Sequence, residues 1–155
     1  MSRWIIRPAA ESDTKAAARL CVQVNPLRES GESGSVGFWE RFFLGALHSE
    51  DAALIVAEAR SQIIGFAYAE IEHSSDDCVK GPYASFDLLG VDHLWRKKGI
   101  ARALIDAVEN WSRSKGMSVI QLAVAEDNRR GLELYESLGY RTVMRKMQRK
   151  LQESP

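Results

Sequence analysis

Apolar residues occur along the chain both in short runs and at helical spacing, and these two patterns divide it into strands and helices. Short apolar runs bounded by turn residues predict strands at residues 3–7, 53–59, 63–71, 83–91 and 118–124. Helical spacing predicts two helices between the first two strands, at residues 15–24 and 38–48. A stretch rich in Gly, Ser and Glu at residues 29–37 predicts a mobile loop between these helices.

Strands alternate with helices in the second half of the chain. One helix carries its apolar residues on a single stripe, at Ile100, Leu104, Val108 and Trp111. Another helix begins at Asp127 or Asn128 and ends at Gly139, and residues 140–151 are predicted to form a last strand. Antiparallel neighbours joined by a short turn therefore come first, and a βαβα unit follows. The predicted fold class is α/β (α+β), with a mixed, mostly antiparallel central sheet flanked by helices.

Length and composition narrow the class of protein. The chain has 155 residues, so we expect one domain over residues 1–155, with a core of about 3–151. Twenty-one basic residues balance twenty-one acidic ones, which argues against a nucleic-acid binder. No apolar run is long enough for a signal peptide or a membrane span, so we expect a cytoplasmic protein without membrane binding. Two distant cysteines and three scattered histidines predict neither a disulfide framework nor a metal site.

A short basic loop follows the strand at residues 83–91 and leads into a helix. Its charged members are Arg96, Lys97, Lys98 and Arg102, and the small residues Gly99 and Ala101 flank Ile100. Free N–H groups and the helix dipole make such a helix start suitable for a pyrophosphate. The spacing matches neither a Walker loop nor the three-glycine dinucleotide fingerprint. A solvated basic helix start is the alternative interpretation.

This loop resembles the acetyl-CoA signature of the GNAT superfamily of N-acetyltransferases, through the pattern Arg96-x-x-Gly99-x-Ala101. The segment Asn128-x-x-Gly131-x-x-Leu134-Tyr135 is similar to the last helix of that superfamily, and the opening Ile6-Arg7-Pro8-Ala9 followed by Asp13 resembles its usual start. The resemblance implies a GNAT-like acyl-CoA N-acyltransferase fold with splayed fourth and fifth strands. It also implies transfer of an acetyl group from acetyl-CoA to a primary amine by direct attack in a ternary complex.

The resemblance further implies which residues bind acetyl-CoA. Backbone groups of Leu89 and Val91 would bind the pantetheine arm, and the Leu89 N–H would polarise the thioester carbonyl. The N–H groups of residues 97–102 would bind the pyrophosphate, and Asn128 would contact the far side of the pantetheine. The implied cofactor-binding residues are Leu89, Val91, Arg96, Lys97, Lys98, Gly99, Ile100, Ala101, Arg102 and Asn128.

Tyr135 and Asp87 are the candidate catalytic residues. Tyr135 matches the tyrosine of the family that protonates the departing thiolate, although its place on the apolar side of a helix also fits a core tyrosine. Asp87 lies in an otherwise apolar strand, where it would act as the general base or form a salt bridge to a neighbouring strand. Glu70 and Glu72 are weaker candidates, acting through water or binding a cationic substrate. The fifth strand offers only Gln121 where some relatives carry a glutamate.

The remaining expectations concern the acceptor and the quaternary structure. Among the aromatic residues at 38–43, we interpret Phe42 and Phe43 as core and leave Trp39 open as a wall of the acceptor pocket. The acceptor would be a small-molecule amine or a protein amine. A non-catalytic acetyl-CoA sensor or interaction module is the alternative function. Because residues 140–151 barely hold a hairpin, we expect one long strand that crosses to a partner subunit in a homodimer, the alternative being a solvated basic edge.

Overall fold

The computed structural model describes residues 3–24 and 34–152 and contains one five-stranded sheet of order β1-β2-β3-β4-β5. Neighbouring strands are antiparallel except β4 and β5, which are parallel, so the predicted mixed sheet is confirmed. The strands are β1 (Ile5–Pro8), β2 (Ala52–Ala59), β3 (Gln62–Glu72), β4 (Tyr83–Val91) and β5 (Ile120–Leu122). The α-helices are α1 (Thr14–Val24), α2 (Val36–Leu47), α3 (Ile100–Ser114) and α4 (Arg129–Ser137). Short 3-10 helices occupy Glu11–Asp13 and His93–Trp95.

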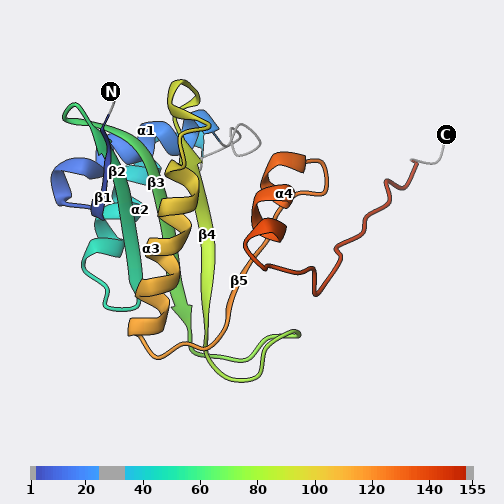
Figure 1. Cartoon of the computed structure of the whole chain (residues 1–155). Coiled ribbons are helices and arrows are strands. Elements are labelled where there is room, and N and C mark those ends of the chain that lie inside the picture. The colour runs from blue at the N-terminus through green and yellow to red at the C-terminus, as the bar shows by residue number, and fades with distance from the viewer. Residues whose placement is uncertain (1–2, 25–33, 153–155) are drawn as a thin grey trace.

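The helices cover both faces of the sheet, with α1 and α2 on one face and α3 on the other (Figure 1). The first apolar core lies under α1 and α2, where Cys21, Phe43 and Phe66 are fully buried. The second core lies under α3, where Leu104 and Val108 pack on small residues of the central strands. Most of the apolar area is therefore buried in two layers on either side of β2, β3 and β4.

Close packing of α3 and α1 on the sheet requires two glycines. A Cβ atom at Gly90 of β4 would lie 2.6 Å from both a ring carbon of Phe66 and a methyl carbon of Val24. A Cβ atom at Gly65 of β3 would lie 3.2 Å from a methyl carbon of Leu104 on α3. Because these two positions carry no side chain, both helix layers pack close to the sheet. The first turn of α3 therefore lies close to the end of β4.

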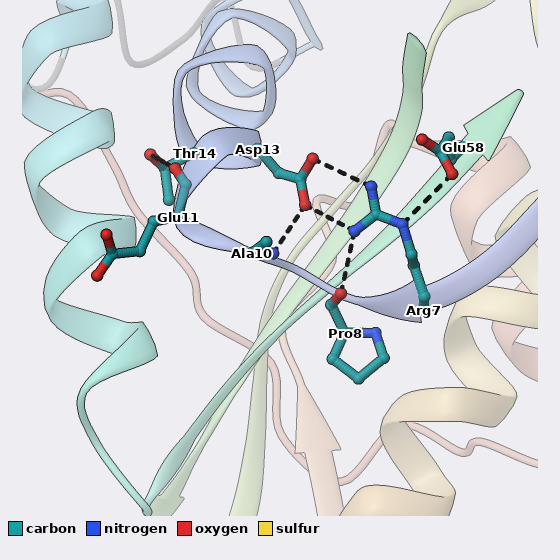
Figure 2. A network of polar contacts seen from close by, with 7 residues as sticks. All are labelled: Arg7, Pro8, Ala10, Glu11, Asp13, Thr14 and Glu58. Atoms are coloured by element: carbon teal, nitrogen blue, oxygen red, sulfur yellow. Dashed lines mark hydrogen bonds and ion pairs between the residues drawn. The ribbon is translucent and has the colours of Figure 1, made fainter. Parts of the chain in front are cut away.

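An ion pair fixes the connection between β1 and α1 (Figure 2). The guanidinium of Arg7 donates to both carboxylate oxygens of Asp13, over 2.7 and 3.1 Å, and to Glu58 of β2 over 3.4 Å. Asp13 is only 8% exposed and also accepts from the backbone N–H of Ala10 at 2.7 Å. The hydrogen bond from Arg7 holds the pKa of Asp13 below its ordinary value.

The structure differs from the sequence prediction at several boundaries. Residues 140–152 form no strand, although a last strand was predicted there, because within the described ranges this segment meets no strand edge with which to pair. Strand β5 has three residues rather than the predicted seven at 118–124, because its pairing to β4 stops at Leu122. Helix α2 begins at Val36, because the Ser35 side chain accepts from the Phe38 N–H and caps it. Residues 25–33, which hold part of the predicted loop, lie outside the described residues. None of the described helices combines the length and the apolar character that a bilayer crossing requires.

We expect Asp13→Asn to lower the free energy of unfolding at pH 7 by on the order of 3 kcal/mol, because it leaves Arg7 partly buried without its counter-charge. Since folding lowers the pKa of Asp13, its contribution is complete above the unfolded value of about 4 and is lost as the pH falls through the folded value. Urea denaturation at pH 7 and at pH 3 measures both effects. Glu58→Gln, at the longer and more exposed contact, is the matched control and should cost less than about 1 kcal/mol. Equal losses in the two variants would contradict this account.

Candidate active site

Strand β4 contains a β-bulge at Asp87. Leu88 lies opposite Tyr68 of β3, but the next residue of β3, Ala69, lies opposite Phe86, so Asp87 is the extra residue. A bulge changes which side of the strand the following residues face. As a result Phe86 packs under α3 and Leu88 packs under α1 and α2, and both side chains are buried.

The bulge also redirects the backbone N–H groups of β4. Before it, the N–H of Ala84 donates to Val119 beside β5 at 2.9 Å, whereas after it the N–H of Asp92 donates to Ile64 of β3 at 2.8 Å. N–H groups alternate between the two edges of a regular strand. The amides of Leu88 and Gly90 therefore point toward β3, and those of Leu89 and Val91 point toward the β5 side.

Among the residues that the structure describes, no strand covers that side of β4 beyond the bulge. Pairing between β4 and β5 is limited to Ala84–Phe86 against Ile120–Leu122, after which β5 leads away to α4 (Figure 1). Within the described ranges, the amides of Leu89 and Val91 thus have no strand partner. This divergence is the predicted splay of the fourth and fifth strands. It leaves the N–H groups of Leu89 and Val91 as donors for an extended ligand, which would occupy the position of an additional strand.

The start of α3 lies just after this end of β4. Lys97 and Gly99 both have positive φ, at 63° and 83°, and Gly99 is the residue that precedes the first turn of α3. Alternating backbone conformations of this kind are the pattern of an anion-binding nest, in which successive N–H groups turn toward one point. A side chain at Gly99 would meet only Trp4, at 4.0 Å, so the loop is open to an approaching ligand.

Four cations surround this nest. The side chains of Arg96, Lys97, Lys98 and Arg102 are exposed, and none of them has an ion pair with any other residue that the structure describes. Ile100, in contrast, is buried in the second core and anchors the first turn of α3. Unpaired cations beside a helix N-terminus suit a polyphosphate, and a bound pyrophosphate would fit the residues present.

Helix α4 carries Asn128 and Tyr135. Asn128 caps the helix, and its side-chain oxygen accepts from the Gly131 N–H at 3.0 Å. Tyr135 is half-buried against the second core, and burial raises its pKa. The Tyr135 hydroxyl has no hydrogen-bond partner among the described residues, whereas the neighbouring Tyr140 hydroxyl donates to Glu109 at 2.7 Å. Leu89, Val91 and Tyr135 all pack at the margin of that same core.

Acidic side chains gather on the opposite face of β3 and β4. The Tyr68 hydroxyl donates to Glu70 at 2.6 Å, and Asp87 accepts from the Ser85 hydroxyl at 2.6 Å. The pKa of Glu72 is raised by its hydrogen bond to Glu70, by burial and by repulsion from Glu70 and Asp87. Burial and Glu70 also raise the pKa of Tyr68. This cluster forms a strongly negative region beside the bulge.

A cavity of about 370 Å³ adjoins this acidic cluster. It lies between the C-terminal half of α2 and the end of β3, and its lining includes Phe42, Asp51, Tyr68, Glu70 and Glu72. Phe42 is 38% exposed, so its interpretation as a core residue was wrong, because it faces this cavity from the edge of α2. Phe43 is core as predicted, and Trp39, which was left open, is 5% exposed within the first core.

Comparisons with a family model, with curated proteins and with solved structures all lead to the same family. The Acetyltransferase (GNAT) family matches residues 17–140. An uncharacterized N-acetyltransferase, YhfO, of Bacillus subtilis is 31% identical over 87% of this chain and 88% of that protein. An aminoglycoside N(6')-acetyltransferase type 1 of Salmonella typhimurium is 28% identical over 64% of this chain and 69% of that protein. A mycothiol acetyltransferase of Thermobispora bispora is 33% identical over 59% of this chain but only 30% of that protein.

The chain belongs to the GNAT acetyltransferase family. Among solved structures, the aminoglycoside N-acetyltransferase AAC(6')-Iy in complex with CoA has the same fold, with a TM-score of 0.84 and 22% identity over 97% of this chain and 96% of that chain. Membership confirms the resemblance that the three sequence segments suggested. It also confirms the expected enzyme class, an acetyl-CoA-dependent N-acetyltransferase with acetyl-CoA as co-substrate.

Three features of this GNAT site were not found from the sequence. The bulge at Asp87 leaves no signal in a strand whose apolar residues continue on both sides of it. Tyr68 was placed in a strand without a role, yet it bonds to Glu70 and lines the cavity. Phe42 belongs to an aromatic run in which helical spacing alone does not separate core from cavity positions.

Proposed function

We propose that this enzyme transfers an acetyl group from acetyl-CoA to a primary amine of a small cationic molecule, by direct attack in a ternary complex. The observation that carries the proposal is the pair of Leu89 and Val91 amides, which point away from β3 at the place where β5 has diverged. The opening between β4 and β5 has the Tyr135 hydroxyl on one side and the acidic cluster on the other. The cluster consists of Glu70, Glu72 and Asp87, and these groups provide the remaining chemistry.

The backbone binds and orients the thioester. The Leu89 N–H donates to the thioester carbonyl oxygen, where negative charge develops as the amine attacks, and the Val91 N–H binds the pantetheine arm. Both donors are fixed by the β3–β4 pairing, so no reorganisation is needed at the moment of reaction. The nest at residues 97–102 and its cations bind the pyrophosphate, and Asn128, whose oxygen caps α4, keeps its amide nitrogen for the pantetheine.

The reaction needs two proton transfers, one from the amine and one to the thiolate, and they take place on opposite sides of the opening. The incoming amine must lose a proton, and Asp87, the carboxylate at the bulge, accepts it through water, which leaves Glu72 for a second positive charge of the acceptor. The departing thiolate takes a proton from Tyr135, whose hydroxyl is not engaged with any other described side chain. Neither step requires a covalent intermediate on the enzyme.

The acceptor is proposed to carry more than one positive charge. Phe42 and Tyr68 give the cavity apolar walls, and Glu70, Glu72 and Asp51 give it negative charge. This combination favours an amine with an apolar or sugar-like body and a second cationic group. The similarity to the Salmonella aminoglycoside acetyltransferase supports a small-molecule acceptor of this kind.

We expect Tyr135→Phe to lower kcat by about 10²-fold while leaving the affinity for acetyl-CoA nearly unchanged, because only the proton donor is removed. Release of CoA from acetyl-CoA with a panel of monoamines and polyamines measures turnover, and titration calorimetry measures binding. Tyr140→Phe is the matched control, because it removes a hydroxyl that bonds to Glu109 rather than one at the opening.

Unchanged turnover in Tyr135→Phe would show that Tyr135 is not the acid. If acetyl-CoA bound normally but no amine of the panel were acetylated, the chain would be a non-catalytic acetyl-CoA sensor, the alternative function, and the proposal would fail.

We expect Glu72→Gln to raise KM for a diamine about tenfold and for a matched monoamine less than threefold, because only the second charge of the diamine uses this carboxylate. Since the pKa of Glu72 is raised, wild-type affinity for the diamine should weaken as the pH falls through that value. The variant should lose this pH dependence. Steady-state kinetics between pH 5 and 8 test both statements, and equal effects on the two amines would contradict the acceptor assignment.

A further inference from the structure

Strand β5 has little support from the backbone pairing of the sheet. It has three residues, all of them half-buried, and among the described residues it pairs with β4 alone. That pairing is parallel, which is slightly less stable per residue than antiparallel pairing. None of the residues of α4, which follows β5 and is described throughout, is fully buried. Yet Asn128 and Tyr135, to which the proposed function gives roles at the opening, both belong to this β5–α4 unit.

A side-chain hydrogen bond ties β5 to the loop before β4. The side-chain amide of Gln121, the central residue of β5, donates to the Oδ2 atom of Asp76. In the register of the two strands, Gln121 lies opposite Ser85, and the last pair after it is Phe86 with Leu122. The bond is therefore made one residue pair before the point where β5 diverges from β4.

The Asp76 carboxylate is held in place from within its own loop. Its Oδ1 atom accepts from the backbone N–H groups of Cys78 and Val79, each at 2.8 Å, and the Asp76 N–H donates to the Val79 carbonyl at 3.0 Å. The hydrogen bond from Cys78, followed by that from Gln121, lowers the pKa of Asp76 below its ordinary value. An ionised carboxylate in a fixed position thus presents its second oxygen to β5, and hydrogen bonds to charged acceptors are stronger than neutral ones.

The chemistry of residue 121 matters for this contact. A glutamine donates an N–H to the carboxylate, whereas a glutamate has no proton to donate at neutral pH. A glutamate there would also place a second negative charge against Asp76, and like charges side by side on neighbouring strands destabilise their pairing. Tyr83 lies beside the pair at the start of β4, where burial and the charge of Asp76 raise the pKa of its hydroxyl.

We propose that Asp76 and Gln121 are positioning residues of the acetyl-CoA site, because their hydrogen bond fixes where β5 leaves β4 (Figure 1). The inference rests on the proposed function, since it concerns the same opening. The two side chains act through β5 and α4, which they keep in the position that Asn128 and Tyr135 need. Without the bond, β5 separates locally from β4 while β2 and β3 keep their pairing.

Calorimetric titration of the full chain with CoA tests the proposal. Gln121→Glu should raise Kd for CoA about fivefold, because it replaces a charge-assisted hydrogen bond by repulsion. KM for the amine that the wild type acetylates fastest should change less than about twofold. The reason is that the described lining of the acceptor cavity comes from α2, β2, β3 and the turn before β2.

A second variant restores the contact with the partners reversed. In Asp76→Asn combined with Gln121→Glu, the asparagine amide donates to the glutamate, so Kd for CoA should return to within about twofold of the wild type. Gln62→Glu is the matched control. It makes the same change at an exposed glutamine that begins β3 and has no side-chain hydrogen bond to another described residue, so it should leave Kd nearly unchanged.

Hydrogen exchange separates positioning from a general loss of stability. Amides of residues 120–122 should exchange faster in Gln121→Glu and at the wild-type rate in the double variant, while amides of β2 and β3 stay the same in all three proteins. Wild-type CoA affinity in Gln121→Glu would overturn the inference and leave the proposed function standing. A double variant as weak as Gln121→Glu, or equally faster exchange in β2 and β3, would also overturn it. A wild type that does not bind CoA would overturn the proposed function and this inference with it.

Discussion

The geometry of this site depends on one extra residue in β4. Without the bulge at Asp87, the strand would keep its alternation, and the amides of Leu89 and Val91 would bond to β3 instead of facing the opening. The same residue lets Phe86 and Leu88 enter different cores, so both helix layers pack on a strand that changes its orientation midway. A single local irregularity therefore joins the packing of the fold to the two donors that we propose for the reaction.

The divergence of β5 makes those donors accessible, and the helix layers pack closely on the part of β4 that carries them. Gly90 allows Phe66 and Val24 to pack directly on the end of β4, and Gly65 allows α3 to start beside that end. The net charge of zero is a sum of separated regions, with cations around the start of α3 and carboxylates around Glu72 and Asp87. The anionic co-substrate and the proposed cationic acceptor would thus each meet a field of opposite sign on different faces of β4.

Much of the fold followed from periodicity and motifs, and the rest depends on long-range pairing. The stripe from Ile100 to Trp111, the turn at Arg60 and Ser61 and the basic loop before Ile100 were all recognisable, because each is encoded within a few neighbouring residues. The bulge at Asp87 and the early end of β5 depend on which strand lies opposite, which no local pattern records. The separation of Phe42 from Phe43 and the predicted last strand also failed for this reason, since burial and pairing are decided by distant residues.

Amide hydrogen exchange along β4 tests the central claim most directly. In the free enzyme, the amides of Leu88 and Gly90 should be protected by β3, and those of Leu89 and Val91 should exchange rapidly. Saturating CoA should protect Leu89 and Val91 and leave the other two amides as they were. Protection of Leu89 and Val91 in the free enzyme, or no change there on CoA binding, would contradict the account of the bulge as the feature that creates the cofactor site.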